Sequence, residues 1–136
     1  MKKNIFILIS FLISNILISQ TIKKEQIIGT WKVEKTLTET SNPNFKDIIE
    51  GFTSSNFRFD ENGNFGLSSP NKSKMFLMML EMVKNKKWKL DNSRQLIKIG
   101  SEKDHFSIME IIVKSSDDKI FFLINESKLE FEMQKI

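Results

Sequence analysis

Few residues in this chain have the chemistry of a catalytic or metal site. The 136 residues include a single histidine, His105, and no cysteine. They contain no paired acidic motif, glycine-rich phosphate loop, nucleophile elbow or metal-ligand spacing. Glu110 lies among apolar residues, where it could hold a ligand head group with Lys35 or Arg58, or could lie at a strand end near water. The sequence therefore predicts a protein that is not an enzyme and uses no cofactor and no metal.

Methionines are concentrated in residues 73–85, which hold four of the seven in the chain: Met75, Met78, Met79 and Met82. Their thioethers are soft ligands that suit Cu(I), but no histidine or cysteine is close in sequence to complete such a site. Methionine is flexible and polarizable, and is frequent on surfaces that accept several partners. Two interpretations follow. Met75, Met78, Met79 and Met82 form a lid over the mouth of the barrel predicted below, or they fill gaps in a helix packed on that barrel.

The elements that must position these residues are predicted by a period-two alternation of apolar and polar side chains, typical of strands with one buried face. Six stretches show it: 31–38, 56–60, 65–67, 87–90, 97–99 and 128–134. Two further stretches complete the eight candidate strands: 105–113, which is rich in Ile and Phe, and 120–124. Asn62-Gly63 is a strong hairpin signal. Residues 120–124 are apolar on both faces, which indicates a central strand. Short strands with short turns and no recurring parallel crossover predict an all-β meander closed into a barrel, or a sandwich.

Two segments break the alternation. Within residues 39–53, apolar side chains stand at the helical spacing i, i+3, i+4 and i+7: Phe45, Ile48, Ile49 and Phe52. This spacing predicts a short amphipathic helix. Residues 73–85 are rich in unbranched Met and Leu, which favour a helix, although a strand continuing into Lys86 is the alternative.

The N-terminus predicts a secretory signal peptide over residues 1–19, followed by one domain over residues 20–136. Lys2 and Lys3 precede an apolar run, and small Ser19 marks a cleavage position. The alternative is an uncleaved anchor, but the run is short for a membrane span. The protein is therefore expected to be exported, to the periplasm or the medium in a bacterium. The whole chain has a formal net charge of +4, and losing both lysines leaves too little charge to indicate nucleic-acid or membrane binding.

The order of several motifs resembles a known family. They are Ile28-Gly29-Thr30-Trp31-Lys32-Val33, Phe57 to Phe65 with its Asn-Gly turn, Trp88-Lys89-Leu90-Asp91 with Leu96-Ile97-Lys98-Ile99, and Leu129-Glu130-Phe131. Together they resemble the lipocalins and the wider calycin group, and more closely the short lipocalin-like domains of exported bacterial proteins. The resemblance implies an eight-stranded antiparallel up-and-down barrel with one or two short helices.

The same resemblance implies that Trp31 closes the bottom of the barrel. Lipocalins pack a late arginine over this tryptophan, whereas both arginines of this chain, Arg58 and Arg94, precede the last strands. Lys128 or Lys135 would take its place as the cation over the ring.

A barrel of this kind predicts a binder of a small hydrophobic, lipid-like ligand held by inward apolar side chains. The candidate binding residues are Trp31, Val33, Phe57, Phe59, Phe65, Met78, Met82, Trp88, Ile108, Phe122, Phe131 and Met133. A barrel of this size can also be filled by its own side chains. The alternative is therefore a structural or protein-interaction module with no small ligand.

Overall fold

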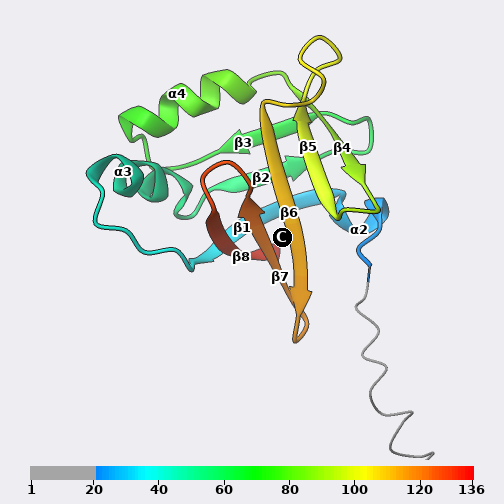
Figure 1. The fold of residues 1–136 in the computed structure, drawn as a ribbon, viewed down its shortest axis with the longest axis horizontal. Helices are drawn as coiled ribbons and strands as arrows, with labels where there is room; N and C mark the ends of the chain where they lie inside the picture. Colours follow the sequence, from blue (N-terminus) through cyan, green and yellow to red (C-terminus); the bar gives the residue numbers. More distant parts are fainter. Residues whose placement is uncertain (1–20) are drawn as a thin grey trace, which may run out of the picture.

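The computed structural model describes residues 21–136, so the predicted signal peptide lies outside the described residues. The chain forms eight strands and, in the described part, three short helices (Figure 1). The strands are β1 (Gly29–Thr36), β2 (Asn56–Phe59), β3 (Phe65–Ser68), β4 (Lys87–Asp91), β5 (Leu96–Gly100), β6 (Met109–Ser116), β7 (Lys119–Ile124) and β8 (Leu129–Lys135). The helices are α2 (Lys24–Ile27), α3 (Pro43–Phe52) and α4 (Lys74–Val83).

The strands form one antiparallel sheet in the order β3-β2-β1-β8-β7-β6-β5-β4. Strand β1 pairs with both β2 and β8, so the first and last strands of the meander are neighbours. At the remaining seam, the Phe65 N–H donates to the Lys86 carbonyl at 3.0 Å and the Trp88 N–H to the Gly63 carbonyl at 2.9 Å. The sheet is therefore a nearly closed up-and-down barrel, which confirms the predicted fold class.

The predicted Asn-Gly hairpin joins β2 to β3. The Asp60 carboxylate accepts the backbone N–H groups of Asn62 at 3.0 Å and Asn64 at 2.8 Å. Gly63 has φ +85°, a conformation that glycine adopts without strain. The hydrogen bond from the Asn64 backbone is the largest of several that lower the pKa of Asp60. The turn is thus held by the side chain that begins it.

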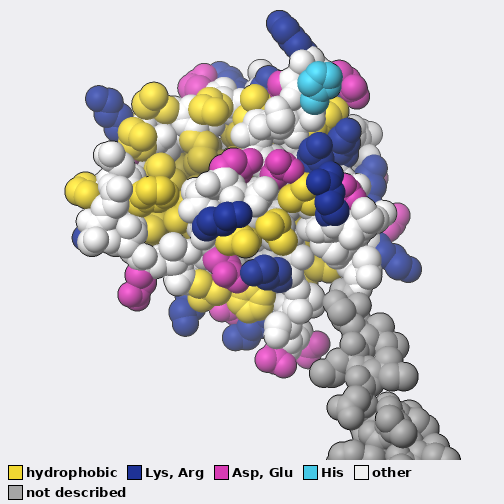
Figure 2. Space-filling model, in the orientation of Figure 1, with side chains coloured by type: hydrophobic (Ala, Val, Ile, Leu, Met, Phe, Trp, Pro, Cys, Tyr) yellow, Lys and Arg dark blue, Asp and Glu magenta, His cyan; other side chains and the backbone are white. Residues whose placement is uncertain are grey.

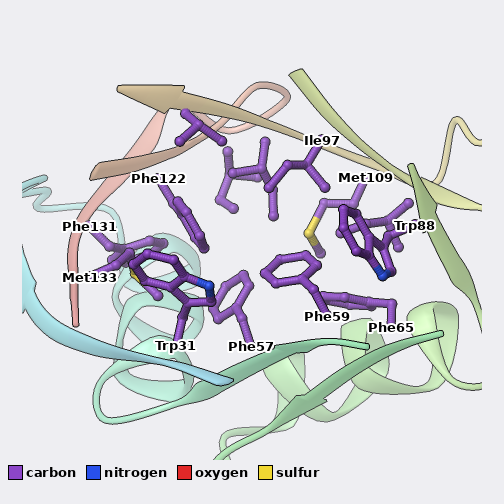
Figure 3. Close-up of a cluster of buried hydrophobic side chains, with 14 of the residues drawn as sticks. Trp31, Phe57, Phe59, Phe65, Trp88, Ile97, Met109, Phe122, Phe131 and Met133 are labelled. Carbon is purple, nitrogen blue, oxygen red and sulfur yellow. The ribbon is translucent and has the colours of Figure 1, made fainter. Parts of the chain in front are cut away.

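Aromatic side chains occupy the barrel interior (Figure 3). The Phe122 ring from β7 lies 5.6 Å from Trp31 of β1, 5.7 Å from Phe57 of β2 and 6.0 Å from Phe59 of β2, between ring centroids. The Phe59 ring in turn lies 5.3 Å from Trp88 of β4. These contacts cross the barrel between strands that are not neighbours, so the rings fill its centre and hold the two halves of the sheet together.

Trp31 lies at the α2 end of the barrel. Its indole N–H donates to the Ile27 carbonyl at 2.8 Å, and the Lys135 ammonium lies 5.5 Å from its ring centroid. The same ammonium donates to the Gln26 carbonyl at 3.0 Å. Of the two lysines considered above, Lys135 is therefore the one whose ammonium lies over the Trp31 ring. Gly29, which has φ +135°, leaves room for the Lys135 side chain, because a Cβ at this position would lie only 2.7 Å from Lys135 Cε.

Two details differ from the sequence prediction. Helix α2 was not expected, because four residues are too few to show a helical period. Strand β6 begins at Met109 rather than at residue 105. Residues 101–107 instead form a turn in which His105 and Phe106 have φ +58° and +55°, values that a β-strand does not accept.

The Asp104 carboxylate holds this turn, and we predict that it makes folding acid-sensitive. Hydrogen bonds from the Ser101 backbone N–H first, and then from the Ser101 hydroxyl, lower the pKa of Asp104 from 3.8 to about 2. Because the pKa is lowered by folding, this stabilisation is fully present above about pH 4 and is lost as the pH falls through about 2. The melting temperature of Asp104→Asn should therefore fall less than that of the wild type between these two pH values.

Glu102→Gln is the matched control for Asp104→Asn, because Glu102 is an exposed carboxylate in the same turn. Its acid profile should follow the wild type. If Asp104→Asn and the wild type melt in parallel over the acid range, Asp104 does not hold the turn as a carboxylate.

Candidate functional site

The site is built on helices α3 and α4, which lie together on one side of the barrel, far from α2 in Figure 1. Helix α3 begins after Asn42, whose side chain accepts the Asn44 N–H at 3.0 Å, and proline occupies its first turn. It confirms the helix predicted within residues 39–53. Helix α4 confirms the helical interpretation of residues 73–85 over the strand alternative.

Close packing joins the two helices. A Cβ at Gly51 of α3 would overlap with the ring of Phe76 of α4, so only glycine allows this approach. Phe52 and Phe76 are fully buried, and their rings meet edge to face at 5.1 Å between centroids. The position and tilt of α4 over the barrel therefore depend on the Gly51 and Phe76 pair.

Polar contacts fix the start of α4. The Asn71 side-chain amide donates to the carbonyls of Glu50 at 2.9 Å and Thr53 at 2.7 Å, at the end of α3. The Asp47 carboxylate accepts the Met75 N–H at 2.8 Å, which places a negative charge at the positive end of the α4 dipole. The segment before α4 is thus tied to α3 at several points.

A groove of about 360 Å³ lies beside this helix pair. Its walls come from α3, α4, the beginning of β6, the end of β7 and the turn between β7 and β8. The lining residues are Ile48, Phe52, Met75, Met78, Met79, Met82, Val83, Ile108, Met109, Ile124, Glu126 and Ser127. Figure 2 shows hydrophobic side chains gathered over α3 and α4 on the same face.

Five methionines line this groove, four from α4 and Met109 from β6. Met78 is 59% exposed and Met82 is 57% exposed, so these two side chains do not fill gaps in the core. Helix α4 packs instead through Phe76 and Val83, which are buried. The helical spacing of the methionines places them along one side of α4. This side presents flexible apolar side chains to the groove and to solvent.

The structure divides the predicted binding residues into two groups. Met78, Met82 and Ile108 line the groove. The others lie in the barrel core, each at most 6% exposed: Trp31, Val33, Phe57, Phe59, Phe65, Trp88, Phe122, Phe131 and Met133. Phe52 lies between the groups, since it lines the groove while its ring centroid is 4.9 Å from that of Phe131.

Several groove residues were not among the predicted binding residues. Ile48 and Phe52 belong to the apolar face of the predicted first helix, so their helical spacing was a usable signal. Met109 and Ile124 carry no such signal, because their strand pattern does not tell a residue at the mouth of the barrel from one at its centre.

The groove has few polar lining residues. Glu126 is its one charged lining residue, and its Oε1 accepts the backbone N–H of Glu110 at 2.9 Å. Glu110 lies half-buried on β6, whereas Lys35 and Arg58 are exposed on β1 and β2, which are not neighbours of β6. The structure therefore does not bring these three predicted head-group residues together.

His105 is exposed in the turn before β6. Within residues 21–136, no group of three or more His, Cys, Asp or Glu side chains is arranged to hold a metal ion. Over the same residues, no helix combines the length and apolar character needed to cross a membrane.

Comparisons with known protein families, with curated proteins and with solved structures give no match to this chain. The architecture itself is consistent with a calycin-like barrel. Any function must therefore be argued from the groove and from the contacts around it.

Proposed function

We propose that this protein is an exported, lipocalin-like domain that binds a small hydrophobic ligand in the groove beside α4. The observation that carries the proposal is the groove itself, about 360 Å³ in volume and lined by five methionines, two of them more than half exposed. This volume falls within the roughly 300–1,000 Å³ typical of small-molecule sites. Export rests on Lys2, Lys3 and the apolar run that follows them.

The groove suits a ligand better than the barrel interior does. In the interior, ring centroids lie 4.9 to 6.3 Å apart, so a ligand there would have to displace packed aromatic side chains. In the groove, a ligand would cover apolar surface that is otherwise exposed to water, which is favourable at about 25 cal/mol per Å². Methionine side chains adapt to ligand shape because they have several rotatable bonds. The proposed ligand is therefore small and mainly aliphatic or aromatic.

The size of the groove limits the ligand. At about 30 Å³ for each water-sized volume, the groove accommodates roughly a dozen non-hydrogen atoms. Each methylene transferred from water contributes about 0.8 kcal/mol, which is roughly fourfold in affinity. A series of primary alcohols should therefore bind more tightly with each added carbon until the groove is full, and then gain little.

Met78→Asp should abolish uptake of the neutral fluorescent probe N-phenyl-1-naphthylamine and leave folding intact. The substitution places a carboxylate on the groove wall, where an apolar ligand would desolvate it, so we expect affinity to fall at least about tenfold. Met78 is 59% exposed, so the free energy of unfolding should change by no more than about 0.5 kcal/mol. Probe fluorescence and chemical denaturation measure the two effects.

Leu77→Asp is the matched control for Met78→Asp. Leu77 is the preceding residue of α4 and is 42% exposed, but it does not line the groove. The Leu77→Asp variant should take up the probe as the wild type does. If Met78→Asp still binds the probe, or if both variants lose it equally, the groove is not the binding site.

A further inference from the structure

The polar end of the groove carries an unpaired negative charge. Glu126 is the charged residue of the lining, and within residues 21–136 its carboxylate makes no salt bridge. The lysine of the same turn, Lys128, donates from its Nζ to Asn125 Oδ1 at 2.9 Å. The groove therefore joins an apolar wall to a carboxylate that has no cationic partner among the described residues.

The orientation of this carboxylate is restrained. Glu126 Oε1 accepts the Glu110 N–H at 2.9 Å, and the Asn125 N–H donates to the Glu110 carbonyl at 2.8 Å. The turn between β7 and β8 is thus held against the start of β6 by two hydrogen bonds. A restrained carboxylate loses less side-chain entropy when it pairs with a ligand than a freely rotating one does.

We propose that the ligand of this groove is an amphiphile with a cationic head group, such as a long-chain amine, rather than a fatty acid. This inference rests on the proposed function and names its ligand class. The aliphatic part would lie along the methionines of α4, and the ammonium would lie beside Glu126. A carboxylate head would instead meet a like charge, which costs binding free energy.

The net charge of the protein does not explain a preference for a cationic ligand. Lys2 and Lys3 account for half of the formal net charge of +4, so the chain without the predicted signal peptide keeps only a small positive excess, which would not attract a cationic amphiphile non-specifically. A preference for the cation would therefore report on the local charge at Glu126. Because Glu126 is exposed, the effect should be modest and should weaken as salt is added.

Three decyl compounds with permanent or no charge test the inference: decyltrimethylammonium, decanol and decyl sulfate. Each displaces N-phenyl-1-naphthylamine from the full mature chain at low ionic strength, below its micelle concentration. We expect the ammonium to bind about fivefold more tightly than the sulfate, with decanol between them. Glu126→Gln should bring the ratio of ammonium to sulfate affinity close to one. Glu61→Gln, which changes an exposed carboxylate in the turn between β2 and β3, should keep the wild-type ratio.

The outcomes separate the two proposals. Equal binding of the three compounds, tightest binding of the sulfate, or an unchanged ratio in Glu126→Gln would overturn the cationic head group while the hydrophobic site stands. Failure of all three compounds to displace the probe would overturn the proposed function, and the head-group inference with it.

Discussion

Trp31→Ala should lower the free energy of unfolding by about 3–5 kcal/mol. The Trp31 side chain is 6% exposed, and its ring packs against Phe122 at 5.6 Å between centroids. Its indole N–H donates to the Ile27 carbonyl at 2.8 Å, and the Lys135 ammonium lies over its ring at 5.5 Å. One substitution therefore removes a large core side chain, the hydrogen bond to the Ile27 carbonyl and the ring beneath the Lys135 ammonium. Urea denaturation followed by circular dichroism measures the loss.

Trp31→Phe separates packing from hydrogen bonding, and it protects the test if the alanine variant does not fold. Phenylalanine keeps a ring in the core but cannot donate to the Ile27 carbonyl, so it should lose about 1–3 kcal/mol. Lys135→Gln removes the exposed cation and its hydrogen bond to the Gln26 carbonyl, and should lose about 1 kcal/mol or less. A wild-type melting temperature for Trp31→Ala would contradict the role of Trp31 in closing this end of the barrel.

Phe52→Ala should have an effect of similar size, about 3–5 kcal/mol, and should also change the groove. Phe52 is 1% exposed, and its ring centroid lies 5.8 Å from Phe57, 5.1 Å from Phe76 and 4.9 Å from Phe131. It packs on Phe76 of α4 and on Phe57 and Phe131 of the barrel interior, and it also lines the groove. Its removal should open the groove toward the interior, so that the folded fraction binds larger ligands than the wild type does.

Phe52→Leu is the control, because leucine keeps most of the buried volume. This variant should lose roughly 1 kcal/mol and should keep the ligand-size preference of the wild type. Denaturation midpoints give the stability change, and the alcohol series gives the ligand-size limit. An alanine variant that is as stable as the leucine variant would show that Phe52 does not separate the groove from the interior.

The strands and the two longer helices could be predicted because their patterns are local. Phe57 and Phe59 lie on one face of β2 since residues two apart in a strand point the same way, and both are buried as expected. The pairing of β1 with β8 could also be predicted, because an eight-stranded meander that closes into a barrel places its first and last strands side by side.

The groove could be predicted only in part, because it depends on tertiary contacts. Its shape follows from the approach of Gly51 to Phe76, two residues that no sequence period connects. The start of β6, which places Ile108 and Met109 at the groove, is set by the hydrogen bonds from Ser101 to the Asp104 side chain. The inward aromatic residues were predicted to bind ligand. Alternation identifies which side chains are buried, but it does not distinguish side chains that pack on one another from side chains that line an empty cavity.

The methionine methyl groups offer the most direct test of where the ligand binds. Five groove methionines and the core residue Met133, which is 5% exposed, report on the two locations within one spectrum. Protein labelled at the methionine methyl carbons is titrated with decanol, and single Met→Leu variants assign the signals. We predict that the groove signals shift together and saturate at one affinity while the Met133 signal stays in place. A titration that shifts Met133 and leaves the groove methionines unchanged would contradict binding in the groove.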